Sequence, residues 1–336
     1  MLFRSLASLL VVSENACSTG AFLFLSGAVF FYLVRFALPQ REEQAVATIS
    51  TRMYVLFFLL GLLTIAWGVE EFGRAGLVFG RGGASPIGLF LWMALVIVPI
   101  PMPPWSKWFS GVMELLPRGV SLSVVVFICS IALKFASLLS VSYPDLSWKH
   151  KLVFYLLGML GCAFSLLRLF AADTKRRMAG CLPGFFLSLV LVSLGVSRTG
   201  LVLSAYFACI FVPVFTGLIL CAWAMEIRGA LPRLFAALLF ALVWGLPGTP
   251  VYQIFSGIGA RSLELGIGYT IVFGLLWFFY FNANIHIYRR ILLLGEGGSP
   301  EDADPIASLA PRLFAGYGLF LMLLVILVAQ IAGRIL

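Results

Sequence analysis

Charged side chains are scarce in this sequence. Asp, Glu, Lys and Arg make up 11% of its 336 residues, whereas hydrophobic residues make up 62%. Average soluble chains carry about 25% charged residues, so this composition excludes a water-soluble globular domain of useful size. We therefore expect a polytopic α-helical membrane protein, because a helix satisfies its own backbone hydrogen bonds where lipid cannot.

Histidine is rare, and no cysteine pair has metal-binding spacing. The chain has two His, and its six Cys all lie in apolar segments without a CxxC motif. These cysteines are interpreted as small packing residues, neither a disulfide framework nor a metal site. The sequence also lacks a nucleotide-binding loop. We therefore expect no metal and no bound cofactor.

Acidic residues are outnumbered by basic ones, 14 to 23, which gives a net charge of +9. The basic residues are scattered in short connections, a pattern that indicates the positive-inside rule and does not indicate nucleic-acid binding. Most of them fall on one predicted face. That face is predicted to be cytoplasmic, with both termini outside.

Apolar segments long enough to cross a bilayer, at about 20 residues each, predict about ten transmembrane helices. They lie near 7–36, 53–73, 85–104, 119–141, 152–170, 179–197, 201–225, 233–247, 266–288 and 313–333. The stretch 248–263 is too short and too rich in Gly and Pro to cross alone. We expect it to be an interruption or a partial helix joined to the segment before it.

Two ionisable residues, Glu14 and Lys134, lie well inside apolar segments. A central charge costs about 2.5–3.5 kcal/mol on insertion scales, so each needs a partner, water or a change of protonation. If they face each other, they form a pair whose charge state can be switched. The alternative is that either side chain snorkels to the surface or forms a fixed interhelical tie.

A third group of charges stands in 170-FAADTKRRMAG-180, where one apolar segment ends and the next begins. It contains Asp173, Lys175, Arg176 and Arg177. This cluster either anchors the cytoplasmic face or belongs to an ion-entry or coupling region.

Three stretches together resemble the antiporter-like subunits shared by respiratory complex I, Mrp-type cation/proton antiporters and membrane-bound hydrogenases. The first, 99–134, is similar to the family's Trp-containing loop and following lysine-bearing helix, with Trp108 and Pro117 at the family spacing. The second, 169-LFAADTKRRMAG-180, is similar to T-D-x-K-R-x-L-A-Y. The third, 244-WGLPGTPVYQIFSG-257, is similar to the family's interrupted helix.

The resemblance implies two inverted five-helix repeats, each with a broken helix, around a polar axis at mid-membrane. Residues 1–170 would form a first, incomplete repeat and 171–295 the second, followed by a polar loop and C-terminal helix at 296–336. Glu14 matches the glutamate of the family's fifth helix, so about four leading helices of the complete core would be absent here.

Several ionisable positions of the family carry other residues in this chain. Pro99, Ser130 and Phe255 stand where the family has lysine or another ionisable residue. Lys134 lies one helical turn beyond Ser130 and is a displaced candidate for the same role. The chain therefore resembles a shortened, degenerate member.

What the resemblance implies is a bacterial inner-membrane subunit of a complex I-like or Mrp-like assembly. It would take part in proton or sodium translocation driven by redox chemistry in partner subunits. The ion-pathway candidates are Glu14, Lys134, Asp173, Lys175 and Arg176, and no residue is predicted to be catalytic. Any enzymatic role would be that of a cofactor-free subunit in an NADH-quinone oxidoreductase-like translocase.

Other membrane subunits and lipid are the expected partners. Two alternatives stay open. The lost ionisable residues are also compatible with a non-conducting structural subunit of such a complex, and the composition alone with an unrelated stand-alone secondary transporter.

Overall fold

The computed structural model describes residues 15–37, 43–72, 85–101, 109, 112–113, 124–132, 134–135, 146–172, 175–196, 247 and 249–288. These ranges contain the helices α2 (Ala16–Ala37), α3 (Glu43–Phe72), α4 (Pro86–Ile97), α7 (Trp148–Phe170), α8 (Lys175–Val196), α11 (Pro250–Leu265) and α12 (Ile267–Tyr288). Residues 124–132 are also helical. The predicted all-α class is confirmed for this part of the chain.

Long apolar helices give the described part the character of a multi-pass membrane protein. Within these ranges, three helical stretches are long and apolar enough to cross a membrane: Ala47–Glu70, Trp148–Phe170 and Ile267–Ile285. They agree with the predicted segments 53–73, 152–170 and 266–288. The segments 201–225 and 313–333 lie outside the described residues, so the ten helices and the inverted repeat stay predictions.

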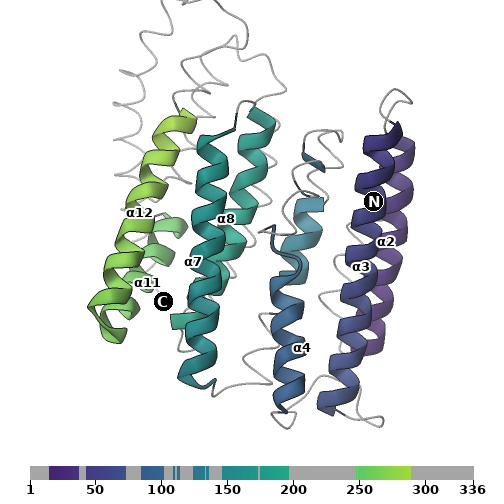
Figure 1. Ribbon diagram of the computed structural model, residues 1–336, viewed down its shortest axis with the longest axis horizontal. Coiled ribbons are helices and arrows are strands. Elements are labelled where there is room, and N and C mark those ends of the chain that lie inside the picture. The colour runs from purple at the N-terminus through teal and green to yellow at the C-terminus, as the bar shows by residue number, and fades with distance from the viewer. Residues whose placement is uncertain are drawn as a thin grey trace, which may run out of the picture.

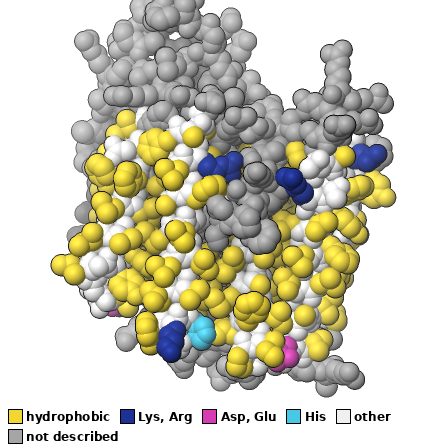
Figure 2. Space-filling model, viewed as in Figure 1, with side chains coloured by type: hydrophobic (Ala, Val, Ile, Leu, Met, Phe, Trp, Pro, Cys, Tyr) yellow, Lys and Arg dark blue, Asp and Glu magenta, His cyan; other side chains and the backbone are white. Residues whose placement is uncertain are grey.

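The helices stand side by side in one bundle (Figure 1). α2 and α3 form one flank, α4 lies in the middle, and α7 and α8 separate it from α11 and α12 on the other flank. Hydrophobic side chains cover the visible side of the bundle, while charged side chains gather near its two ends (Figure 2). This distribution is typical of helices whose sides face lipid and whose ends face water.

Glycines bring the backbones of α7 and α8 into close contact. A Cβ atom on Gly158 would lie 2.5 Å from the amide nitrogen of Val192, and one on Gly195 would lie 2.6 Å from that of Tyr155. The two helices are therefore antiparallel, and their approach depends on the absence of a side chain at both points. Lipid gives no hydrophobic drive for helix association, so such close packing is a main source of stability.

Glycines also allow close contact between α2 and α3. Cβ atoms on Gly20 and Gly27 would lie within 3 Å of Ile65 and Phe57, respectively. α2 begins at Ala16, and the side chain of Asn15 accepts a hydrogen bond of 2.7 Å from the N–H of Cys17, as an N-cap does. The predicted segment 7–36 thus contains a helix start at residue 16.

The helical stretch 124–132 and the neighbouring Phe135 connect the α2–α3 flank to α4. Phe127 packs edge-on against Phe30 of α2 at 5.7 Å and Phe57 of α3 at 5.3 Å between ring centroids. On the other side, the indole N–H of Trp92 in α4 donates to the Phe135 carbonyl over 3.3 Å. Trp92 in turn packs edge-on against Phe154 of α7. An aromatic chain thus runs through the middle of the bundle.

We predict that Gly158→Ala lowers the free energy of unfolding by about 1–3 kcal/mol, because the added methyl group forces α7 and α8 apart. The measurement is unfolding of the purified protein in detergent followed by circular dichroism. Gly274→Ala on α12 is the matched control, since no atom lies within 4 Å of its added Cβ. Because Ala has a higher helix propensity than Gly, Gly274→Ala is expected to keep or raise stability, and a Gly158→Ala variant as stable as Gly274→Ala would contradict the close contact.

We also predict that Trp92→Phe lowers stability by about 1–3 kcal/mol, because the buried hydrogen bond to the Phe135 carbonyl is lost and the smaller ring leaves part of the buried space unfilled. The same unfolding assay measures this. Trp148→Phe is the control, because the Trp148 side chain is largely exposed. Unchanged stability in Trp92→Phe would mean that the indole bond contributes nothing to holding 124–135 against α4.

Candidate functional site

α4 ends inside the bundle. It starts at a side-chain cap, where Ser85 Oγ accepts a hydrogen bond of 2.8 Å from the N–H of Gly88. At about 1.5 Å per residue, its 12 residues span about 18 Å, which is shorter than a hydrocarbon core of about 30 Å. The following residues 98–101 are irregular and buried. The predicted crossing at 85–104 therefore contains a half-length helix.

Two prolines explain where α4 stops. Pro99 and Pro101 have no backbone N–H, so two carbonyls in the last turn of the helix lose their usual intrahelical donors. The N–H of Ile100 bonds instead to the Ile97 carbonyl over 3.1 Å, which tightens the chain into a turn. Irregular backbone at this depth is tolerated only where protein or water covers it.

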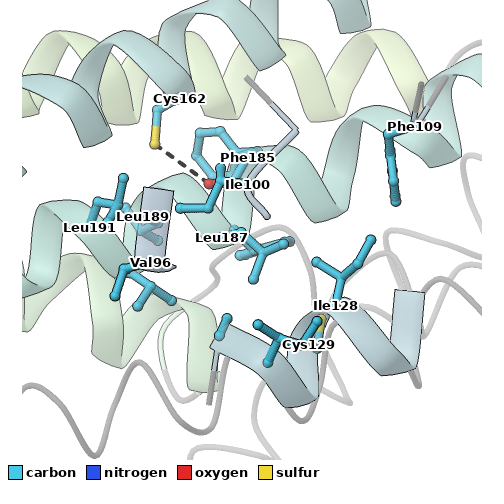
Figure 3. Close-up of a cluster of buried hydrophobic side chains, with 14 of the residues drawn as sticks. Val96, Ile100, Phe109, Ile128, Cys129, Cys162, Phe185, Leu187, Leu189 and Leu191 are labelled. Atoms are coloured by element: carbon cyan, nitrogen blue, oxygen red, sulfur yellow. Dashed lines mark hydrogen bonds between the residues drawn. The ribbon is translucent and has the colours of Figure 1, made fainter. Parts of the chain in front are cut away.

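Protein covers this end of α4 on the side of α7 and α8. A Cβ atom on Gly184 of α8 would lie 3.0 Å from Ser165 Oγ of α7 and 3.5 Å from the Pro101 carbonyl oxygen. Gly184 therefore marks the point where the three segments meet. The surrounding side chains are apolar, as Figure 3 shows for Val96, Ile100 and Leu187. The Cys162 thiol in the same cluster donates to the Phe185 carbonyl over 3.5 Å.

α11 is a second short helix with one end in the interior, in this case its start. Its N-cap is Thr249, which is 4% exposed and whose hydroxyl accepts from the N–H of Tyr252 over 3.2 Å. Pro250 follows at the first helical position, where a missing N–H costs nothing. α11 agrees with the predicted partial helix at 248–263. Its preceding segment lies outside the described residues.

Lys134 carries the buried charge among the side chains that the structure describes. It is 7% exposed, whereas the other buried polar side chains in the described ranges are uncharged. It directly precedes Phe135, whose carbonyl is bound by Trp92, so its backbone lies beside the middle of α4. The buried position predicted for Lys134 is therefore observed, and snorkelling to the surface is not.

The other predicted pathway residues are only partly visible. Glu14 and Asp173 lie outside the described residues. Lys175 and Arg176 open α8, with side chains that the structure does not describe.

Phe255, which the sequence resemblance aligned with an ionisable residue, lies in a packed aromatic cluster. Its ring is fully buried and lies 5.1 Å from Tyr280, 5.4 Å from Trp277 and 5.6 Å from Phe273, all of α12. Tyr280 also stacks on Phe185 of α8 at 4.6 Å. The cluster has the density of a structural core and places no charge there.

Asn284 is a buried polar residue of α12. It is 1% exposed, and its amide N–H donates to the Tyr280 carbonyl over 2.9 Å. Its amide oxygen has no partner among the described residues. A metal centre has no candidate in the described ranges, where no three His, Cys, Asp or Glu residues lie close enough to share an ion.

No protein-family model matches this chain, and no curated protein matches its sequence. Solved structures do resemble it. A chain of respiratory complex I from Thermus thermophilus, solved with bound aureothin, superposes with a TM-score of 0.67 at 16% identity. The match covers 97% of this chain and 76% of that chain.

A chain of the Mrp complex from Dietzia sp. superposes with a TM-score of 0.69, also at 16% identity. Here the match covers 95% of this chain but 38% of the other, so this protein spans well under half of that chain's length. At this identity the likeness shows the fold. The bundle described above is therefore the helical fold found in membrane chains of complex I and the Mrp complex.

Proposed function

We propose that this protein is a membrane subunit of a multi-subunit complex I-like or Mrp-like assembly, and that it takes part in proton or sodium translocation. Redox chemistry in partner subunits would supply the energy. The observation that carries the proposal is the buried Lys134 beside the half-length helix α4, within a fold shared with chains of both complexes.

A charge in this position has a free-energy cost. A lysine at mid-membrane costs about 2.5–3.5 kcal/mol on insertion scales, and such residues commonly mark ion paths. Helices that stop at mid-membrane place backbone carbonyls and helix ends beside such paths in transporters. α4 and α11 both have an end in the interior, which supports a polar route near these ends.

The roles follow from position. Lys134 would hold or pass a proton inside the membrane, and Glu14 would be the carboxylate whose charge it balances. Asp173, Lys175 and Arg176 would form a charged group at the cytoplasmic surface. The chain would lie in a bacterial inner membrane with both termini outside, as an incomplete first repeat (1–170), a second repeat (171–295) and a C-terminal helix.

A second candidate is a non-conducting structural subunit of the same kind of complex. The aromatic packing around Phe255 favours it, because a closely packed, uncharged cluster occupies the place where an ionisable residue would be needed. In that case the chain would hold neighbouring subunits in place, and Lys134 would be a structural contact.

We predict that Lys134→Met and Glu14→Gln each reduce ion translocation at least tenfold, because each removes a group that must change its charge. The assay uses inverted membrane vesicles from cells making the assembled complex, with proton uptake followed by a pH-sensitive dye and sodium uptake by isotope.

Lys149→Met is the matched control, since Lys149 is an exposed lysine at the end of α7. Translocation that stays normal in Lys134→Met and Glu14→Gln, with the complex fully assembled, rejects the conducting role and supports the structural one. Ion transport by the purified chain without partners would instead indicate a stand-alone transporter.

A further inference from the structure

A cavity of about 390 Å³ lies at the end of the bundle where α7 begins and α8 ends. The turn between α11 and α12 forms its other side. Two spans start at this level, at Trp148 and Ile267. The cavity therefore opens where the helices leave the hydrocarbon, and its size is within the range of ligand pockets, about 300–1,000 Å³.

Two cationic side chains from different helices line the cavity: Lys151 of α7 and Arg261 of α11. Glu264 also lines it, and both of its carboxylate oxygens accept from the same nitrogen, Nη1 of Arg261. This arrangement orients the guanidinium and leaves its Nη2 and Nε hydrogens for another acceptor. With one acid against two bases, the described part of the lining has a net positive charge and suits an anion.

The rest of the lining is apolar and aromatic. Leu152, Val196 and Leu265 supply aliphatic wall, and Trp148 and Tyr269 supply rings. Trp and Tyr are enriched at membrane–water interfaces because their rings are amphipathic. A soluble anion alone would leave this apolar wall uncovered, whereas a lipid brings an acyl chain together with its headgroup.

Close contacts hold the walls in place. Gly195 lets the end of α8 press on α7, since its Cβ would lie 2.7 Å from the Lys151 carbonyl oxygen. Gly266, with φ of 134°, lets α11 turn directly into α12. The Tyr155 hydroxyl then donates to the Tyr269 carbonyl over 2.9 Å and ties α7 to α12. The backbone segments that bear Lys151 and Arg261 are thus held together by direct contacts.

We infer that this cavity binds the phosphate-bearing headgroup of an anionic phospholipid. Lys151 and Arg261 bind the phosphate oxygens, Glu264 orients Arg261, and the acyl chains run along the apolar wall toward the lipid-facing side of α12. Basic pockets between membrane helices recognise anionic headgroups in this way. The inference does not depend on whether the protein conducts ions.

The test uses the purified full-length protein in detergent, with phosphatidylglycerol, phosphatidylcholine or inorganic phosphate added. Native mass spectrometry measures bound lipid, and thermal melting measures stabilisation. The wild type is expected to bind phosphatidylglycerol in preference to phosphatidylcholine. Lys151→Gln and Arg261→Gln are each expected to weaken that binding about tenfold, the usual worth of one charge-assisted hydrogen bond.

Lys149→Gln is the matched control, because Lys149 precedes Lys151 on α7 but lies outside the cavity. Glu264→Gln is expected to strengthen binding, since its amide oxygen can still accept from Arg261 while the opposing charge is removed, and this gain cannot come from misfolding. Equal phosphatidylglycerol binding in the wild type, Lys151→Gln and Arg261→Gln overturns the proposal. So does an equal loss in Lys149→Gln, or equal stabilisation by inorganic phosphate alone.

Discussion

Backbone hydrogen-bonding groups have no partner in hydrocarbon, and the centre of this bundle depends on how the chain covers them where α4 and α11 stop. Pro99 and Pro101 end α4, and neither residue has a backbone N–H to donate. The freed backbone lies against α7 and α8, with Gly184 at the meeting point. α11 meets the same demand differently, by a threonine cap and a proline at its first position. Neighbouring helices therefore cover the end of α4, whereas the start of α11 is satisfied by its own cap.

The glycine contacts of α7 and α8 make this coverage possible. Without side chains at Gly158 and Gly195, the two backbones approach closely enough to act as one wall. α4 and the stretch 124–135 lie on one side of that wall, while α11 and α12 pack on its other side. The two sides differ in chemistry. Lys134 brings a charge into the first, whereas the second is filled by the aromatic cluster around Phe255.

The chemical difference between the two sides of the α7–α8 wall is relevant to function. Two short helices of the described part, α4 and α11, have an end inside the bundle. One of these ends lies near the ionisable Lys134, and the other lies near the aromatic cluster around Phe255. If ions pass through the protein, the side of Lys134 is favoured, because a charged side chain buried in a membrane protein commonly marks an ion path. The charged cavity formed by α7, α8, α11 and α12 lies at the bundle end and serves lipid contact in our interpretation.

The sequence by itself determined the helical class and the membrane environment, because long apolar runs form helices that satisfy their own backbone hydrogen bonds in lipid. It also indicated the partial helix near 248–263 through its Gly and Pro content. The end of α4 was not predicted, since 85–104 was expected to cross, although the prolines after residue 98 were a signal for it. Tertiary structure decided which helices touch, that Lys134 stays buried, and that Lys151 and Arg261 line one cavity although they lie far apart in the chain. Hydropathy indicates how much apolar surface a segment must bury. It does not indicate which other segment will cover that surface, since this depends on how glycines and aromatic rings on different helices pack together.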